Sequence, residues 1–255
     1  SMHVAIIGDA FVDILAGPID TLPQWGRDVE CPSIQQLPGG SALNVAVHLA
    51  TMAKGSNATC SFHGLVGNDD FAAVLRNRLK ECEVIDHCQT TDETGTGVCI
   101  VLTGNGERGF VTQVGATGRL DTSHLGSVRS KLADISKSPS GPKCMHLHIS
   151  GYFSTGALQP ACANFLRELR ADAEAQGVRL TVTFDTNCDA TGKWDSGTRE
   201  VLREVDVFLP NEVEAGGIAG TEDLSAAADT LARLARAAVV ITCGADGAIL
   251  QTRQG

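Results

Sequence analysis

The stretch PGGSALNVAVHLA, residues 38–50, predicts a helix that begins directly after two adjacent glycines. Gly39 and Gly40 can adopt positive φ and let another group approach the backbone closely. Asn44 lies one turn into the helix. Free N–H groups beside bare glycines and an amide suit a small ligand with hydroxyls or an anion, whereas a core helix capped locally by Asn44 is the alternative. The residues that recur at helical spacing and predict the buried face are Leu43, Ala46, Val47 and Ala50.

Short apolar runs alternate with amphipathic segments on both sides of this helix. Residues 4–7 form an apolar run that ends at Gly8-Asp9, as expected of a buried strand in a parallel sheet. This alternation predicts an α/β fold, with a mainly parallel sheet between two layers of helices in a Rossmann-like three-layer core. Further strands are predicted at 60–67, 143–149, 178–184, 205–209 and 238–242, and further helices at 71–83, 120–135, 158–176, 196–204 and 224–237.

Two segments break the alternation and predict a small β sheet outside this core. Residues 18–37 carry scattered prolines and weak strand signals, and residues 97–103 and 110–114 form a hairpin pattern. The intervening turn, residues 104–109, spells the dinucleotide fingerprint Gly-x-Gly-x-x-Gly, but strand residues follow it where the fingerprint needs a helix. We therefore expect a single domain over residues 1–255, with lid segments at approximately 15–37 and 96–115 inserted in its core.

The composition restricts the class of partner. The formal net charge of -10 over 255 residues argues against nucleic acid, because no basic surface would neutralise its phosphates. No apolar run is long enough to cross a bilayer, and Asp9 and Asp13 interrupt the N-terminal apolar run, unlike a signal peptide. Nine cysteines without a Cys-x-x-Cys pair indicate reduced thiols. We therefore expect a cytoplasmic protein with no membrane or nucleic-acid partner.

Polar residues follow several of the predicted strands. Because the carboxyl ends of parallel strands meet at one edge of a sheet, we expect these side chains to lie near one another and to bind a ligand. Carboxylates and amides without a lysine cluster suit Mg²⁺ held through water and phosphate. The alternative for each residue is a helix cap after a strand, as for Asn211 and Glu214. The residues concerned are Asp13, Asp185 with Asn187, Asn211 with Glu214, and Thr242 with Gly244.

A second polar grouping lies within one predicted strand. Cys144, His146 and His148 share one strand face by their period of two, which is compatible with a metal site. Three neighbouring positions on one strand do not converge easily on a single ion. We therefore favour a half-buried face of the sheet over a metal site.

These motifs together resemble the ribokinase family, the phosphofructokinase-B-type carbohydrate kinases. Residues 39–46 resemble its Gly-Gly-x-x-x-Asn-x-Ala signature, and residues 64–69 resemble its Gly-x-x-Gly-x-Asp segment. Residues 185–187 with Trp194 resemble the Asp-Pro-Asn-x-Arg…Trp run of the sugar kinases. Residues 210–215 resemble the Asn-x-x-Glu motif, and residues 242–248 resemble the strand and turn beside the nucleotide. The resemblance covers essentially the whole chain, in order and spacing.

The resemblance implies a ribokinase-like core with a β lid and transfer of the γ-phosphoryl group of ATP to a hydroxymethyl group. ATP and Mg²⁺ are the implied cofactors, with Asn211 and Glu214 arranging the metal through water. The residues implied to bind substrate hydroxyls are Asp13, Gly39, Gly40 and Asn44. The residues implied to lie beside the nucleotide are Asn187, Thr242, Gly244 and Gly247.

Two departures from the family pattern affect this expectation. The family carries a later Gly-Ala-Gly-Asp segment, which supplies an anion hole and the base that accepts the proton of the substrate hydroxyl. The chain contains no such segment, so the expected C-terminal part, with its catalytic Asp, would lie beyond Gly255. Asp189 stands where the sugar-kinase run has Arg, and an acid there would repel a substrate carboxylate or phosphate.

Three functions therefore remain open. A ribokinase-like or fructokinase-like sugar kinase is preferred over an adenosine-type nucleoside kinase, because aromatic residues for base stacking make up only 4% of the chain. The rings to inspect are Phe11, Phe110 and Tyr152. A catalytically silent protein that binds a sugar or nucleotide is the third reading. The open edges of the lid also suggest a homodimer through the lid.

Overall fold

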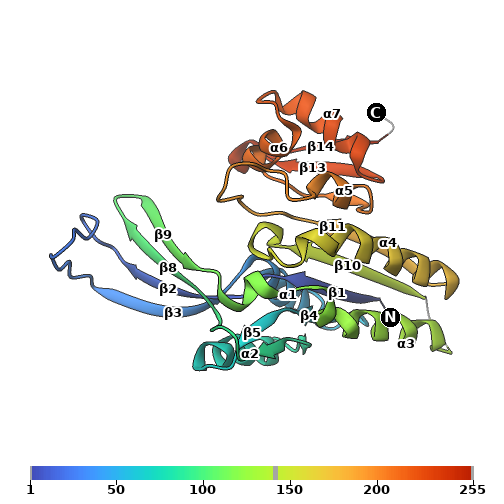
Figure 1. Cartoon of the computed structure of the whole chain (residues 1–255), viewed down its shortest axis with the longest axis horizontal. Helices are drawn as coiled ribbons and strands as arrows, with labels where there is room; N and C mark the ends of the chain where they lie inside the picture. The colour runs from blue at the N-terminus through green and yellow to red at the C-terminus, as the bar shows by residue number, and fades with distance from the viewer. Residues whose placement is uncertain (1, 140–142, 254–255) are drawn as a thin grey trace.

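The computed structural model describes residues 2–139 and 143–253. Its main element is an eight-stranded sheet in the order β14-β13-β12-β11-β10-β1-β4-β6 (Figure 1). Neighbouring strands are parallel except for β13 and β14, so the predicted mainly parallel sheet is confirmed. The strands are β1 (His3–Gly8), β4 (Thr59–His63), β6 (Ile85–Asp86), β10 (Cys144–Ser150), β11 (Arg179–Phe184), β12 (Val207–Phe208), β13 (Ala238–Thr242) and β14 (Ala248–Thr252).

Helices cover both faces of this sheet, which confirms the three-layer core. Alternate residues of β1 point to opposite layers, because successive side chains of a strand leave on opposite faces. Val4 and Ile6 pack with α1 and α2, and Ala5 and Ile7 pack with the other helices. The first layer consists of α1 (Ser41–Met52) and α2 (Asp70–Glu81). The second consists of α3 (Gly126–Lys137), α4 (Gln159–Ala175), α5 (Thr198–Leu202), α6 (Glu212–Ala219) and α7 (Leu224–Leu234).

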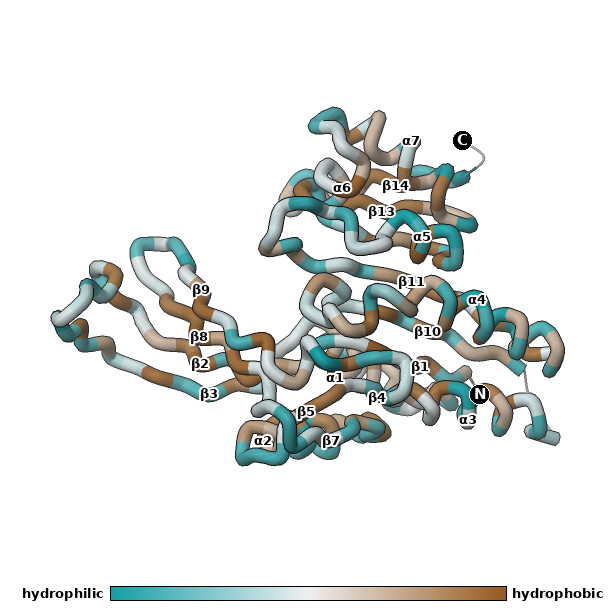
Figure 2. Tube along the Cα trace, in the orientation of Figure 1, coloured by the Kyte–Doolittle hydropathy of each residue, from teal (hydrophilic) through white to brown (hydrophobic). Residues whose placement is uncertain are grey.

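A second sheet of four strands projects from the core (Figure 1). Its order is β3-β2-β8-β9, and we call it the lid sheet. The predicted hairpin is confirmed, with Asn105 and Gly106 at positive φ in the turn, as a two-residue hairpin turn requires. Figure 2 shows apolar residues along β8 and β9. The strands are β2 (Phe11–Gly17), β3 (Ser33–Gly39), β8 (Gly97–Gly104) and β9 (Glu107–Gln113).

Smaller elements join the two sheets and close the loops. A two-stranded sheet pairs β5 with β7 in parallel. In the part of the chain that the structure describes, every helix is too short or too polar to span a bilayer. These elements are β5 (Leu65–Gly67), β7 (Gln89–Thr91) and the 3₁₀ turns η1 (Gly115–Arg119), η2 (Thr122–Leu125), η3 (Tyr152–Ser154) and η4 (Gly244–Asp246).

The structure corrects several predicted boundaries. The helix predicted at 120–135 begins as the 3₁₀ turn η2, because Asp121 accepts hydrogen bonds from the Ser123 backbone N–H and hydroxyl, and α3 starts only at Gly126. The strand predicted at 205–209 forms only two ladder residues, Val207 and Phe208. α1 ends at Met52, and Ala50 is only half-buried, whereas Ala42 joins the buried face.

Candidate active site at the carboxyl edge of the sheet

The carboxyl ends of the parallel strands bring most of the predicted polar residues to one edge, but the prediction is wrong for Asp13, which lies in the lid sheet. The strand order reverses at β1, which lies between β10 on one side and β4 on the other. Ligands of open α/β sheets bind outside the carboxyl ends at such a switch point. From the β13 end toward β1, the residues at this edge are Thr242, Asn211, Asp185, Ser150 and Asp9.

The carboxylate of Asp9, which follows β1, binds the N-terminus of α1. Asp9 is 2% exposed, and its Oδ1 accepts a hydrogen bond of 2.7 Å from the Ala42 N–H. Gly40 adopts φ 103°, and a Cβ there would lie 2.7 Å from the Asp9 carbonyl oxygen. A Cβ on Gly151 would lie 2.1 Å from Asp9 Cγ. The expectation of a free helix N-terminus is therefore wrong in part, because a carboxylate of the chain already binds there.

Burial raises the pKa of Asp9, and the charge of Asp185 raises it further, against the hydrogen bonds from the start of α1. The sequence analysis did not select this residue as a site residue. The signal available was an acid placed directly after a completely buried strand, four residues before Asp13. Local capping by Asn44, the alternative considered, is also wrong, because no side chain of α1 caps its own start.

Asp13 and Gly39 lie against each other in the lid sheet. Asp13 sits in β2, opposite Leu37 of β3 and Cys99 of β8. A Cβ on Gly39 would lie 2.2 Å from Asp13 Oδ2, so only glycine leaves room for this carboxylate. Burial raises the pKa of Asp13 above its ordinary value. The structure therefore brings together two of the four residues implied to bind substrate.

Asn44 lies on an exposed side of α1. It lines a groove whose walls are Leu37 and Pro38 of β3 and residues 74–81 of α2. Gly40 is the N-cap of the same helix, directly after Gly39. Asn44 thus lies one helical turn from the Asp13–Gly39 contact, beside β3.

Asp185 follows β11 and lies along the carboxyl edge between Asp9 and Asn211. Its Oδ2 accepts a hydrogen bond of 3.0 Å from Ser150 Oγ. Burial raises the pKa of Asp185, and its charge in turn raises the pKa of both Asp9 and Glu214. The three carboxyl groups form an acidic row from the start of α1 to the start of α6.

Asn187 holds a neighbouring turn in place. It adopts φ 59°, its Oδ1 accepts the Phe153 N–H at 3.2 Å, and its Nδ2 donates to Ser154 Oγ at 2.9 Å. Its side chain therefore connects the end of β11 to η3. This arrangement differs from a free amide pointing toward a nucleotide.

Asn211 and Glu214 form the capping box of α6. Asn211 Oδ1 accepts the Glu214 N–H, and the two Glu214 oxygens accept the N–H and the Nδ2 of Asn211, all at 2.9 Å. Burial raises the pKa of Glu214, which is 5% exposed. The structure therefore confirms the alternative interpretation that Asn211 and Glu214 cap a helix after a strand. Within residues 2–139 and 143–253, no group of three His, Cys, Asp or Glu side chains could hold a metal ion by itself.

Thr242, Gly244 and Gly247 surround the turn between β13 and β14. Thr242 is exposed, and its N–H donates to the Pro210 carbonyl at 2.9 Å, which places it beside Asn211. A Cβ built on Gly244 or Gly247 would meet no atom within 4 Å. The backbone of this turn therefore faces open space and leaves room for a ligand.

The Asp189 carboxylate is hydrogen-bonded within its own loop, an arrangement that the sequence, from which repulsion of a substrate anion was expected, did not predict. Asp189 is 7% exposed, and its carboxylate accepts hydrogen bonds from the Thr191 N–H, the Thr191 hydroxyl and the Trp194 N–H. These bonds order the loop and place Trp194 on Gly217, where a Cβ would lie 2.5 Å from the indole. The acid has a structural role in this loop.

Of the three rings selected from the sequence, Tyr152 is part of the core. It is 0% exposed, and its hydroxyl donates to the Ser196 carbonyl at 2.7 Å. Phe11 is buried at the base of the lid sheet, whereas Phe110 on β9 is 63% exposed. Strand alternation puts Phe110 on the same face of the lid sheet as Asp13.

Cys144, His146 and His148 share one face of β10, as predicted. The two His146 ring nitrogens lie 2.8 and 2.9 Å from the hydroxyls of Thr181 and Thr183. His148 Nδ1 also bonds to Thr183, and burial lowers the pKa of His148 to about 4. Threonines of β11 thus occupy three of the four histidine nitrogens.

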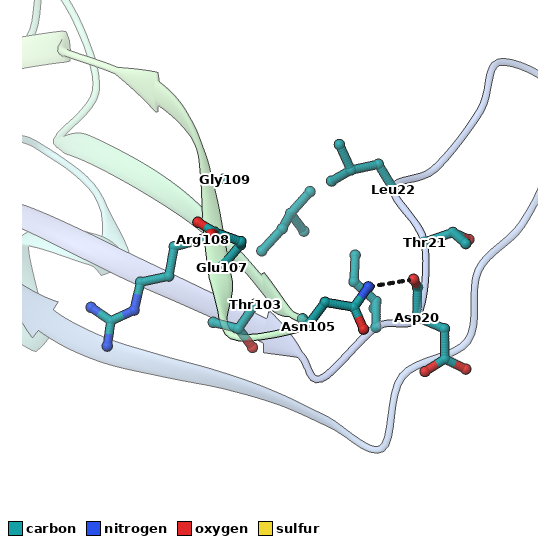
Figure 3. A pocket seen from close by; sticks show the side chains of 11 residues that line it. Asp20, Thr21, Leu22, Thr103, Asn105, Glu107, Arg108 and Gly109 are labelled. Atoms are coloured by element: carbon teal, nitrogen blue, oxygen red, sulfur yellow. Dashed lines mark hydrogen bonds between the residues drawn. The ribbon is translucent and has the colours of Figure 1, made fainter.

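A pocket of about 230 Å³ lies at the tip of the lid sheet (Figure 3). Its walls are residues 19–22 and the β8–β9 turn, where Asn105 Nδ2 donates to the Asp20 carbonyl at 2.9 Å. It lies at the opposite end of the lid strands from Asp13 and Gly39. The candidate active site is therefore the carboxyl edge and not this pocket.

An adenosine kinase of Dictyostelium discoideum is 27% identical over 218 residues, which cover 83% of this chain and 59% of that protein. This chain thus spans less than two thirds of that relative's length.

Two solved structures show the same fold. A ribokinase of Giardia lamblia has a TM-score of 0.75 at 22% identity, over 99% of this chain and 73% of that one. A fructokinase of Xylella fastidiosa with bound ATP has a TM-score of 0.72 at 22% identity, over 99% and 75%. The family described as pfkB family carbohydrate kinase matches residues 3–255. The chain therefore belongs to the pfkB family of carbohydrate kinases.

Proposed function

We propose that the protein is an ATP-dependent kinase that phosphorylates a hydroxymethyl group of a small sugar, ribokinase-like or fructokinase-like. The observation that carries this proposal is the Asp13 carboxylate held against Gly39, beside a helix start that Asp9 already fills. A carboxylate accepts hydrogen bonds from hydroxyl groups and disfavours an anion. The neighbourhood therefore suits a neutral polyol.

Each substrate-binding residue would have a distinct task. Asp13 would accept hydrogen bonds from sugar hydroxyls, and Asn44 can both donate and accept. Gly39 and Gly40 would let the sugar approach the backbone, which has no room for a side chain: a Cβ on Gly39 collides with the Asp13 carboxylate, and a Cβ on Gly40 with the Asp9 backbone carbonyl. These tasks position the substrate, and positioning contributes much of the rate in phosphoryl transfer.

ATP and Mg²⁺ are the proposed cofactors. The open backbone around Thr242, Gly244 and Gly247 would accommodate the nucleotide, with Asn187 nearby. Asn211 and Glu214 would contact the metal through water, because their side chains already bond to each other. Mg²⁺ would neutralise charge on the transferring phosphoryl group. The resemblance implies a catalytic base in a Gly-Ala-Gly-Asp segment, which residues 1–255 do not contain.

An adenosine-type nucleoside kinase is the second candidate. The exposed Phe110 ring on the Asp13 face of the lid sheet favours it, because a ring there could stack on a base. A catalytically silent sugar or nucleotide binder is the third. The adenosine kinase relative is compatible with the second candidate but does not favour it over a sugar kinase.

We further propose one domain over residues 1–255, a cytoplasmic location and a homodimer through the lid sheet. All nine cysteines are free, which suits a reducing compartment. Ile100 and Val111 are paired in register on the lid face opposite Asp13, at 39% and 62% exposure. Apolar residues on one exposed sheet face can be covered by a second copy.

The test is ADP release from ATP and Mg²⁺ in the presence of ribose, fructose or adenosine, together with a binding titration for each. Sugar-dependent ADP release is the expected result for a protein that includes the catalytic Asp implied by the resemblance, and sugar binding is the expected result for residues 1–255 alone. Adenosine-dependent release would favour the nucleoside kinase. Binding without ADP release, in a protein that includes this Asp, would favour the silent binder. If no compound in the panel binds, the proposal is contradicted.

A further inference from the structure

The chain passes between the core and the lid sheet four times. Side-chain hydrogen bonds connect these segments to the core. Asp9 connects the first segment to the start of α1. Thr117, after β9, accepts the Ala10 N–H at 3.4 Å and donates to the Ala10 carbonyl at 2.9 Å. The segment that enters β8 is connected at Thr96, the residue before that strand.

Thr96 connects the start of β8 to the start of α2. Its N–H and its hydroxyl both donate to the Asp69 carboxylate at 2.7 Å. The same hydroxyl accepts the Gly67 N–H at 2.9 Å. Asp69 is also the N-cap of α2, where it accepts the Ala72 N–H at 3.0 Å. One buried hydroxyl therefore bonds to both β5 and the cap of α2, and Thr96 is only 2% exposed.

The surroundings leave this junction little freedom. A Cβ on Gly67 would lie 2.5 Å from the Thr96 nitrogen, and a Cβ on Gly115 would lie 2.5 Å from the Gly95 carbonyl oxygen. The Ala116 N–H donates to that carbonyl at 2.9 Å, so the chain leaving β9 is tied to the chain entering β8. Burial alone would raise the pKa of Asp69, but the hydrogen bonds from Thr96 and α2 lower it, which keeps an ionised acceptor in place.

The position of β8 determines the position of Asp13. β8 pairs with β2 over its length, and Cys99, three residues after Thr96, lies opposite Asp13. We propose that Thr96 is a positioning residue of the active site: through Asp69 it fixes β8 and β2, and so holds Asp13 over Gly39. The effect on the substrate rests on the proposed function, whereas the effect on the strands does not.

Thr96→Val is the decisive variant, because it keeps the shape of the side chain and removes only its hydroxyl. Thr96→Ser restores the hydroxyl. Thr198→Val is the matched control, since Thr198 is 1% exposed and its hydroxyl donates to the Asp195 carbonyl at 2.7 Å, at the start of α5. Amide hydrogen exchange of residues 11–17 and 97–104 is measured without ligand, and sugar affinity is measured separately.

Thr96→Val should speed exchange in β2 and β8 by at least about tenfold and weaken sugar binding by a similar factor, since it removes two hydrogen bonds and one alone corresponds to about tenfold. Thr96→Ser should restore both, and Thr198→Val should change neither. If Thr96→Val behaves like Thr198→Val in both measurements, the inference is wrong. If the unchanged protein binds no sugar, the proposed function fails, and the exchange result still decides whether Thr96 positions β8.

Discussion

At the scale of the residue, contacts between glycines and carboxylates determine the shape of the site. Gly39 lies against the Asp13 carboxylate and Gly151 against the Asp9 carboxylate, whereas Gly40 lies against the Asp9 backbone carbonyl. A Cβ on Gly39 or Gly151 would displace the acid beside it. The two acids therefore remain close to the backbone.

Replacing Gly39 tests this arrangement directly. Gly39→Ala puts a Cβ 2.2 Å from Asp13 Oδ2, so the carboxylate must move. We expect sugar affinity to fall by about tenfold or more, as for the loss of a hydrogen bond to a charged group. The control is Gly109→Ala in β9, where a Cβ meets nothing within 4 Å. Equal sugar affinities for the two variants by calorimetric titration would contradict the role of Gly39.

Asn44→Ala is expected to weaken sugar binding by about two- to tenfold, the effect of one neutral hydrogen bond. Asn44 is exposed on α1, so its removal should leave the thermal unfolding midpoint unchanged. An unchanged sugar affinity in a titration would rule out a role for Asn44 in substrate binding.

The sequence alone allows a residue to be assigned to the site when its role follows from a local sequence pattern. Gly39 and Asp13 stand in such patterns, and the structure brings them together. The tasks of Asp9 and Asp189 could not be predicted, because each depends on donors that the fold supplies from elsewhere: Ala42 for the first, and a loop returning to Trp194 for the second.

At the scale of the element, a chain of buried polar side chains lies beneath α3. His3 Nε2 and His63 Nε2 both bond to Ser61 Oγ, at 2.9 and 2.8 Å, and His63 Nδ1 bonds to Ser127 of α3 at 2.8 Å. The ring of His63 also stacks on His87 at 4.9 Å. Burial lowers the pKa of His3 to about 4 and that of His63 to about 3.

This chain predicts acid sensitivity of the fold. In the unfolded state both histidines take up protons below about pH 6.5, whereas in the folded state His3 resists protonation until about pH 4 and His63 until about pH 3. The unfolded state therefore binds more protons as the pH falls, and stability decreases. We expect the free energy of unfolding to fall between pH 7 and pH 5 by roughly 2 kcal/mol for each histidine.

Urea unfolding at both pH values measures this loss. His63→Gln should reduce the pH dependence, and His48→Gln, at an exposed position of α1, should leave it unchanged. A His63→Gln protein with the same pH dependence as the unchanged protein would show that the buried chain does not cause the effect.

Helices whose apolar residues recur with a clear helical period were predictable from the sequence. Elements whose bounds depend on tertiary contacts were not. α1, α2, α4 and α7 follow from apolar spacing, and α2 also from its capping residue Asp69. The break between η2 and α3 and the two-residue strand β12 depend on how neighbouring segments pair, which no local pattern encodes. The start of β2 at Phe11 likewise depends on pairing with β3 and β8.

At the scale of the whole molecule, a helix-covered parallel sheet carries a projecting lid sheet (Figure 1). This architecture was predictable because strands, helices and hairpin alternate clearly in the sequence. The apolar face of the lid sheet opposite Asp13 was not predictable, because the exposure of Ile100 and Val111 depends on the register of β8 with β9. The register places both on the face opposite Asp13.

The proposed dimer predicts the effect of a charge on this face. Val111→Lys puts an ammonium group on a residue that is 62% exposed, where a second copy would have to desolvate it. We expect a dimer for the unchanged protein and a monomer for Val111→Lys in sedimentation velocity. Met52→Lys, at 84% exposure at the end of α1, is the control and should remain dimeric. If the unchanged protein sediments as a monomer, the proposed homodimer is contradicted.

The central claim is that Asp13, which lies in β2 of the lid sheet, binds a neutral sugar. The most direct measurement is a calorimetric titration of ribose and fructose into the unchanged protein and into Asp13→Ala, with circular dichroism to confirm the fold of both. The account predicts that one sugar binds the unchanged protein and that Asp13→Ala binds it about 10- to 100-fold more weakly, as for a lost hydrogen bond to a charged group. Equal affinities of the two proteins for that sugar would contradict the account.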